Sequence, residues 1–137
     1  MKHKCEMVWL AVLAWLALLS GPAFGHHSVT AEFDPSKEVT VTGVLKQVAW
    51  TNPHIYIFVE AKGDDGKLVT WSFEGNPPGL LHRAGVTKDV FKVGETVTVT
   101  AMPANDGTKN LGFGKVYRYA DGHEIRLSIA REQINLL

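Results

Sequence analysis

The segment Glu38–Trp50, EVTVTGVLKQVAW, decides the fold because its alternating pattern changes phase in the middle. The valines before Gly43 lie on one face of an extended chain, whereas Val44, Val48 and Trp50 share the opposite parity. Gly43 is at this change of phase, where we expect a β-bulge or a sharp bend. A long first strand bent at a glycine is typical of a small closed barrel, since that strand pairs on both sides.

Alternating segments separated by turn residues continue along the chain. Asn52-Pro53 ends the first strand, because a residue before proline is disfavoured in a helix and proline cannot donate to the ladder. The stretches Gly63–Gly66 and Asp121-Gly122 are typical of hairpin turns, since their residues accept positive φ. The further strands are predicted over residues 55–61, 67–74, 96–102, 111–119 and 124–129.

One short helix of two turns is predicted over Asn76–Gly85. Asn76 is a candidate cap, Pro77 suits the first helical position, and Gly85 suits the position after the C-cap. The order of three strands, a short helix and further strands is that of the five-stranded Greek-key barrel called the OB-fold. We therefore predict an all-β fold with one short helix, a small five- to six-stranded OB-like barrel over residues 38–129. An open sandwich of the same strands is the main alternative.

Residues 1–25 have the three parts of a secretory signal peptide. Two lysines form a basic start, residues 7–19 are an unbroken apolar run, and residues 23–25 have a small-x-small pattern. A membrane-spanning helix needs about 20 apolar residues, so an uncleaved anchor is the weaker interpretation. We expect a periplasmic or secreted protein that meets the membrane only through this peptide during export. Residues 26–37 are predicted to be an extended N-terminal segment, and residues 130–137 a C-terminal tail.

The charge balance of the chain limits its partners. The 137 residues include 14 Lys and Arg against 14 Asp and Glu, and cleavage after residue 25 removes Lys2, Lys4 and Glu6, which leaves one net negative charge. This balance excludes a general polyanion binder, so we expect no nucleic-acid partner. The only cysteine, Cys5, also lies in the leader, so the mature chain would have no disulfide and no thiolate site.

Three histidines form the main candidate site. His26 and His27 would stand at the mature N-terminus if cleavage follows Gly25, and His54 closes the turn after the first strand. The free α-amino group and the His26 imidazole would then form a chelate on one residue, and nitrogen donors of this kind suit Cu(II). We therefore predict a transition-metal site at His26, His27 and His54, with copper preferred as the cofactor. The alternative is a solvated N-terminus and a turn histidine that bonds to its own loop.

Aromatic side chains are the second candidate site. Trp50, Tyr56, Phe58, Trp71 and Phe73 lie on or beside the first three predicted strands, which carry the ligand in many OB-folds. Such a cluster is a candidate stacking platform for a sugar, a peptide or a planar ligand, and Trp50, Tyr56 and Trp71 are the predicted contacts. The alternative is that part of the cluster fills the barrel, above all Phe73 and one of the tryptophans.

The sequence has no catalytic motif. Its serines lack a nucleophile-elbow context, and no HExxH, P-loop or GxGxxG sequence occurs. Asp64 and Asp65 are adjacent but belong to a hairpin turn, where solvation explains them. Glu32 and Asp34 are candidate hard ligands near the chain start, where acids are more often solvated. We therefore expect no enzymatic activity.

Several of these stretches resemble a family of small exported bacterial proteins, the domain of unknown function six-one-five-two. The resemblance lies in the start His26-His27-Ser28, in Ala31–Asp34, in the turn Trp50–His54 and in the late strand Gly94–Val99, and it covers most of residues 26–123. It implies export and a barrel, and no activity is assigned to the family. The chain departs from the family pattern in the predicted helix, which has an extra proline and lacks an expected tryptophan.

Together, these patterns predict an exported, non-catalytic binding protein that coordinates a transition metal such as copper through N-terminal histidines. The alternative is an envelope OB-fold module that binds a carbohydrate or a protein partner through its aromatic face, without a metal. In either case the partner is a small ligand or an envelope protein.

Mass spectrometry of the exported protein is expected to show His26 as the first residue, because the small-x-small pattern ends at Gly25. A chain that begins at Phe24 would contradict this prediction and would remove the amino-terminal chelate. A mass equal to that of the uncleaved chain would contradict the signal peptide itself.

Overall fold

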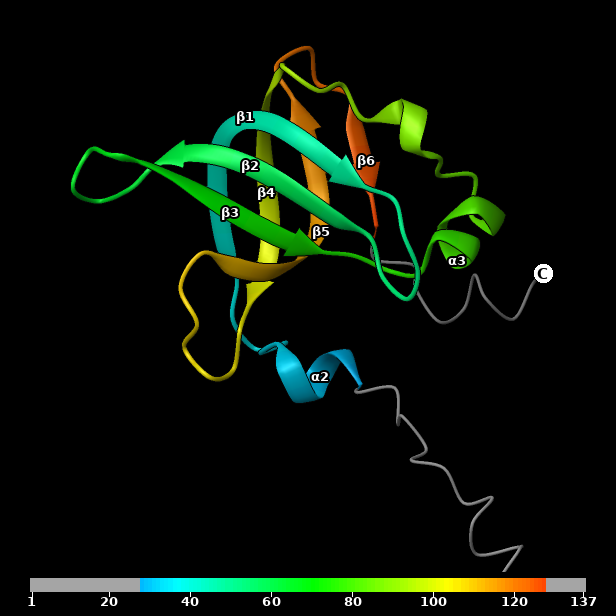
Figure 1. Cartoon of the computed structure of the whole chain (residues 1–137), viewed down its shortest axis with the longest axis horizontal. Coiled ribbons are helices and arrows are strands. Elements are labelled where there is room, and N and C mark those ends of the chain that lie inside the picture. Colours follow the sequence, from blue (N-terminus) through cyan, green and yellow to red (C-terminus); the bar gives the residue numbers. More distant parts are fainter. Residues whose placement is uncertain (1–27, 128–137) are drawn as a thin grey trace, which may run out of the picture.

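The computed structural model describes residues 28–127, in which a twisted sheet curls into a barrel (Figure 1). The strands are β1 (Val39–Ala49), β2 (Tyr56–Lys62), β3 (Leu68–Glu74), β4 (Thr96–Pro103), β5 (Leu111–Tyr119) and β6 (Glu124–Arg126). Short helices within this range are α2 (Val29–Glu32), α3 (Pro78–Arg83) and the 3₁₀ turn η1 (Lys88–Val90). Each strand lies within two residues of its predicted start, because alternation is a local signal.

Pairing between β3 and β5 closes the sheet. The strand order is β3-β2-β1-β4-β5-β6, and β3 also pairs with β5, so five strands form a ring that β6 extends. The β3–β5 pair is parallel, whereas the other pairs in the described part of the chain are antiparallel. This is the strand order of an OB-like barrel with α3 between β3 and β4. The predicted small all-β barrel is therefore confirmed, and the open sandwich is wrong.

β1 pairs on both sides, as its length and its glycine predict. Gly43 lies opposite Ala61 of β2 and Val97 of β4. A Cβ added at Gly43 would lie 2.3 Å from the carbonyl oxygen of Glu60, far inside van der Waals contact. Glycine therefore allows β2 to approach β1 at the point where both neighbours are paired.

The β-bulge in β1 lies later than predicted. The register with β2 shifts between Leu45 and Gln47, not at Gly43. The pairing with β4 ends at Val44, so an extra residue just beyond it interrupts the ladder on one side only. Leu45 is fully buried and Val48 is nearly so, on either side of the shift. The change of phase in the sequence therefore indicates a real β-bulge, but the bulge lies beyond the predicted position at Gly43.

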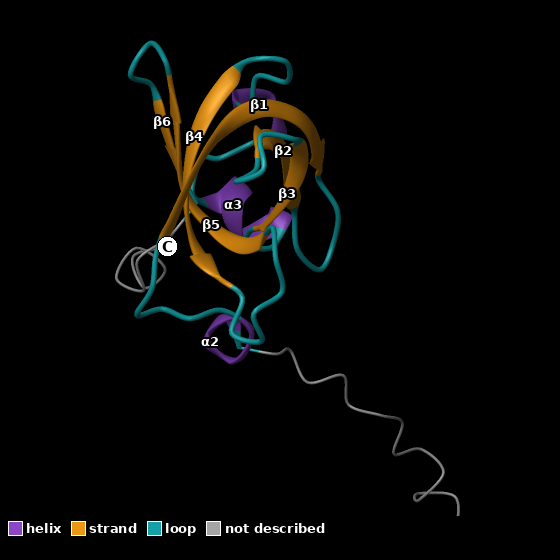
Figure 2. Ribbon diagram, turned by 90° about the vertical axis from the view of Figure 1, so that its left-hand side faces the viewer, coloured by secondary structure: helices purple, strands orange, loops and turns teal. Residues whose placement is uncertain are grey.

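The barrel interior is filled by side chains from all five strands and closed at one end by α3. Figure 2 looks along the barrel, and α3 is seen within the ring of strands. Leu81 of α3 belongs to the same buried cluster as the strand residues. The fully buried apolar side chains include Leu45, Ile55, Ile57, Val59, Phe73, Leu81, Val97, Val99, Tyr117 and Leu127.

α3 ends as predicted but begins later. Gly85 has φ +79°, the left-handed conformation expected just after a helix. Pro77 is the N-cap and Pro78 the first helical residue, one position beyond the prediction. Asn76 does not cap the helix, because its side-chain amide donates to the carbonyl of Leu127 at 2.6 Å. A tertiary contact thus replaces the local role that the sequence indicated.

The described part of the N-terminal segment that was predicted as extended, residues 28–37, contains the helix α2 (Figure 1) and contacts the barrel through Phe33. Phe33 directly follows α2, is only 2% exposed, and forms a bridge with Ala104. Its ring centroid lies 5.7 Å from that of Phe113 on β5. The extended prediction was wrong for α2 because a single helical turn has no periodic signal.

None of the helices within residues 28–127 is long and apolar enough to cross a membrane. β6 ends at Arg126, three residues before the predicted end of the last strand. The predicted signal peptide and the predicted tail over residues 130–137 lie outside the described residues, and so they stay predictions.

Gly43→Ala is expected to lower the free energy of unfolding by about 3 kcal/mol, because its methyl group would collide with the backbone of Glu60. Chemical denaturation of the protein without its leader measures this change. Gly79→Ala on α3 is the matched control: its Cβ would meet only the Arg83 side chain at 3.8 Å, so stability should stay equal or rise. Equal stability of the two variants would contradict the close approach at Gly43.

Candidate functional site

A buried carboxylate lies at one end of the β2–β3 ladder. Glu74, the last residue of β3, pairs with Tyr56, the first residue of β2, and is only 5% exposed. The Tyr56 hydroxyl donates to Oε2 of Glu74 at 3.0 Å, and Nδ1 of His54 is hydrogen-bonded to Oε1. Both carboxylate oxygens therefore have partners, which offsets the cost of burying the group.

The turn between β1 and β2 presents His54 to this carboxylate. β1 ends at Ala49, and the chain turns back through residues 50–53, so that only Ile55 separates His54 from the start of β2. The N–H of Gly75 donates to the carbonyl of Ile55 at 2.9 Å and continues the contact beyond the last strand pair. The His54 loop is thereby fixed against the end of β3.

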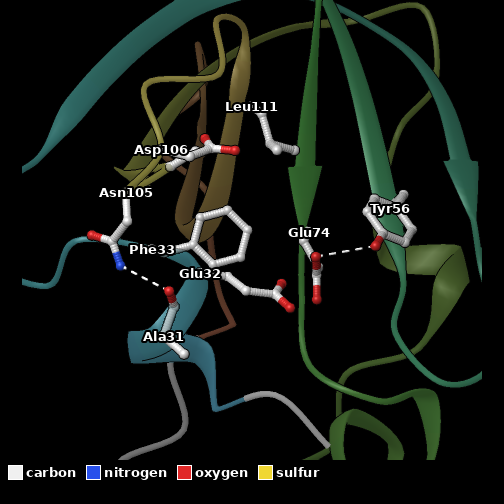
Figure 3. A pocket seen from close by; sticks show the side chains of 9 residues that line it. Ala31, Glu32, Phe33, Tyr56, Glu74, Asn105, Asp106 and Leu111 are labelled. Atoms are coloured by element: carbon white, nitrogen blue, oxygen red, sulfur yellow. Dashed lines mark hydrogen bonds between the residues drawn. The ribbon is translucent and has the colours of Figure 1, made fainter. Parts of the chain in front are cut away.

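Glu74 also forms part of a pocket of about 380 Å³ between α2, the end of the β2–β3 ladder and the β4–β5 loop. In Figure 3 the carboxylates of Glu32 and Glu74 approach the same space, with the ring of Phe33 beside them. The pocket is lined by Ala31, Glu32, Phe33, Tyr56, Glu74, Ala104, Asn105, Asp106 and Leu111. Three of these residues are acidic and none is basic, so the field in the pocket favours a cation.

α2 is held over this pocket by the turn after β4. The side-chain amide of Asn105 donates to the carbonyls of Thr30 and Ala31 at 3.2 and 3.1 Å, and its backbone N–H donates to the carbonyl of Glu32 at 2.8 Å. These bonds satisfy carbonyl groups at the end of α2 that have no partner within the helix. The position of Glu32 therefore depends on a turn more than 70 residues away.

The environment of the site raises the pKa of Tyr56. Burial, followed by the charge and the hydrogen bond of Glu74, raises the pKa of Tyr56 to about 12. The charge of Glu32 acts in the same direction, which agrees with its place in the pocket. Tyr56 therefore stays protonated at neutral pH and donates its hydrogen bond to Glu74.

The three predicted metal ligands have different outcomes. His54 is placed at the buried carboxylate, whereas His26 and His27 lie outside the described residues. Within residues 28–127 there is no group of three His, Cys, Asp or Glu side chains that could hold a metal ion. Asp34 is engaged in its own turn, where hydrogen bonds from Ser36 lower its pKa to about 2. The three-histidine site stays a prediction.

The structure does not bring Trp50, Tyr56 and Trp71 onto one face. The Trp50 ring packs against Phe91, with centroids 6.2 Å apart. Trp71 pairs with the interior residue Val59, whereas Tyr56 pairs with Glu74 outside the barrel. A single platform of these three rings is therefore not formed, and the binding role of each residue stays a prediction.

Reasoning from the sequence alone did not find Glu74. An acidic residue at the end of a predicted strand is usually exposed to solvent. Glu74 is instead buried by α2 and the β4–β5 loop, which are distant from it in the sequence. One local signal was available: the Gly63–Gly66 hairpin fixes the register in which Tyr56 lies opposite Glu74. That register alone places the Tyr56 phenol beside the Glu74 carboxylate, without knowledge of the segments that cover them.

The fold and the site define a small OB-like barrel with a buried carboxylate at one end and an acidic pocket beside it. The chain matches the family described as "Family of unknown function (DUF6152)" over residues 12–113, and it belongs to that family. Neither the curated proteins nor the solved structures contain a match to it.

The tyrosines are expected to titrate late. The pKa values of Tyr56, Tyr117 and Tyr119 are all raised, chiefly by burial, and that of Tyr56 reaches about 12. In the unfolded chain the phenols titrate near 10. Their contribution to stability is therefore complete below about pH 10 and is lost as the pH rises through the folded pKa values.

Phenolate absorbance followed during a pH titration measures these pKa values. Glu74→Gln is expected to lower the pKa of Tyr56, because it removes the neighbouring negative charge. Titration of all three phenols near pH 10 in the folded protein would contradict the burial described here.

Proposed function

We propose that this chain is an exported, non-catalytic binding protein, periplasmic or secreted, that coordinates a transition-metal ion at His54 together with His26 and His27. Copper is the preferred ion. The observation that carries the proposal is the hydrogen bond between Nδ1 of His54 and the buried carboxylate of Glu74.

This hydrogen bond is of the kind that orients a metal ligand. A ligating histidine generally donates its second ring N–H to a carboxylate or a carbonyl, which fixes the tautomer and makes the other nitrogen a better donor. With Nδ1 of His54 at Glu74, the remaining donor is Nε2. No hydrogen bond to Nε2 occurs within residues 28–127, and the His54 side chain keeps 23% of its surface exposed. The nitrogen that a metal requires is therefore available.

The chain start supplies the other nitrogen donors. His26 and His27 directly precede Ser28, the N-cap of α2, and two residues of extended chain span at most about 7 Å. α2 contributes Ala31 and Glu32 to the pocket that contains Glu74. A chelate of the α-amino group and imidazoles suits Cu(II), which prefers nitrogen ligands in a tetragonal arrangement. The acidic lining of the pocket supports a cation at this end of the barrel.

Titration of Cu(II) into protein that begins at His26 is expected to produce a visible d–d absorption band at one equivalent. His54→Ala should weaken binding, because it removes a ligand. Glu74→Gln should weaken binding by about 10- to 100-fold, the range for groups that orient a ligand. Affinity should rise with pH, since imidazole and the α-amino group bind the metal only when deprotonated.

His123→Ala is the matched control, because His123 lies in the β5–β6 turn, where its backbone N–H bonds Asp121. This variant should bind Cu(II) as tightly as the parent protein. One residue added before His26 should also weaken binding, because it displaces the amino-terminal chelate. Equal affinities of His54→Ala, His123→Ala and the parent protein would overturn the proposal.

A further inference from the structure

A second pocket lies at the other end of the β2–β3 ladder and has no part in the proposed metal site. It has a volume of about 460 Å³, within the range of about 300–1,000 Å³ in which small ligands bind. The start of β1, the β2–β3 hairpin and the end of the β4–β5 loop surround it. Lys62 pairs with Leu68 here, six residue pairs away from Tyr56 and Glu74 along the ladder, which corresponds to about 20 Å.

An aromatic ring forms the apolar wall of this pocket. Trp71 stacks on Phe73 with a centroid distance of 5.6 Å and an interplanar angle of 8°. Phe73 therefore overlaps part of one face of the indole, and Trp71 is nevertheless a lining residue of the pocket and only partly buried. The stack holds the ring in place without help from a ligand, so little side-chain entropy is lost on binding.

The charged side chains around the ring nearly balance in sign. Lys62 and Lys109 supply two positive charges, and Asp64 and Asp65 supply two negative charges. Asp65 is engaged in its own turn, since it accepts the N–H of Lys67 at 3.0 Å and contacts the Lys67 ammonium. In the part of the chain that the structure describes, the side chains of Lys62, Asp64 and Lys109 form no hydrogen bond or ion pair. Donors and acceptors are thus available, and with the Lys67 ammonium beside Asp65 the charges around the ring sum to a single positive charge.

We propose that this pocket binds an uncharged saccharide, with a sugar ring lying on Trp71. A sugar presents C–H groups on the face of its ring, which pack on an aromatic plane, and hydroxyl groups at its edge, which donate and accept hydrogen bonds. Asp64 accepts from these hydroxyls, whereas Lys62 and Lys109 donate to them. A net charge this small disfavours a nucleotide or a polyamine, each of which would need a large excess of one sign.

The test uses protein that begins at His26 and carries Trp50→Phe. Of the four tryptophans, Trp9 and Trp15 lie in the leader, so this variant leaves Trp71 as the only fluorescent indole. Cellobiose, maltose and diacetylchitobiose are added separately up to millimolar concentration, and binding is followed by fluorescence and by calorimetry. At least one of them is expected to shift the Trp71 emission and to bind with a dissociation constant in the millimolar range or tighter.

Two variants of the parent protein locate the site. Trp71→Ala should weaken saccharide binding by about tenfold or more. Asp64→Ala combined with Lys109→Ala should weaken it by about fivefold and leave the melting temperature unchanged, since both residues lie in exposed turns. If Trp71→Ala does not fold, the double variant alone tests whether the saccharide binds in this pocket.

Absence of binding by all three saccharides would overturn the proposal, as would affinities that neither variant changes. Cu(II) binding by the double variant should equal that of the parent protein, so that failure here is distinct from failure of the metal site. Binding of a charged ligand such as a nucleotide, in place of the saccharides, would also overturn it.

Discussion

The close approach of β1 and β2 at Gly43 is the constraint on which the structure depends. At this residue β1 is paired with β2 on one side and β4 on the other, and a Cβ would collide with the Glu60 carbonyl. β1 can therefore pair with β2 and β4 at once, and the β3–β5 pair can close the ring. Closure leaves the β2–β3 ladder with two different ends. One end carries the buried carboxylate, and the other carries the pocket at Trp71.

The two ends differ in chemistry because different segments cover them. α2 and the turn at Asn105 cover the outer face of the ladder near Glu74, and they add further acidic groups there. At the other end, two lysines and two aspartates surround a ring of the barrel interior. As proposed above, one small barrel would thus bind a cation and a neutral ligand at sites about 20 Å apart.

Much of the fold could be predicted because the relevant signals are local. Alternation located β2 to β5, and glycines located the turns and the end of α3. The errors arose where a distant contact decides the outcome. Asn76 bonds the carbonyl of Leu127 rather than capping α3, and Asn105 stabilises α2 by bonding its carbonyls. The candidate site was predictable only at His54, since the burial of Glu74 depends on segments far from it in sequence.

In the proposed metal site, Glu74 fixes the ring of His54 and leaves Nε2 as the donor to the metal. Nitrogen-15 NMR of the histidine rings, at a mildly alkaline pH and without added metal, measures the position of the ring proton. We expect His54 in the tautomer with its proton on Nδ1, and we expect Glu74→Gln to shift the tautomer balance toward that of the solvated His123. A His54 ring protonated on Nε2, or one with the same tautomer balance as His123 in the parent protein, would show that Glu74 does not orient the ring.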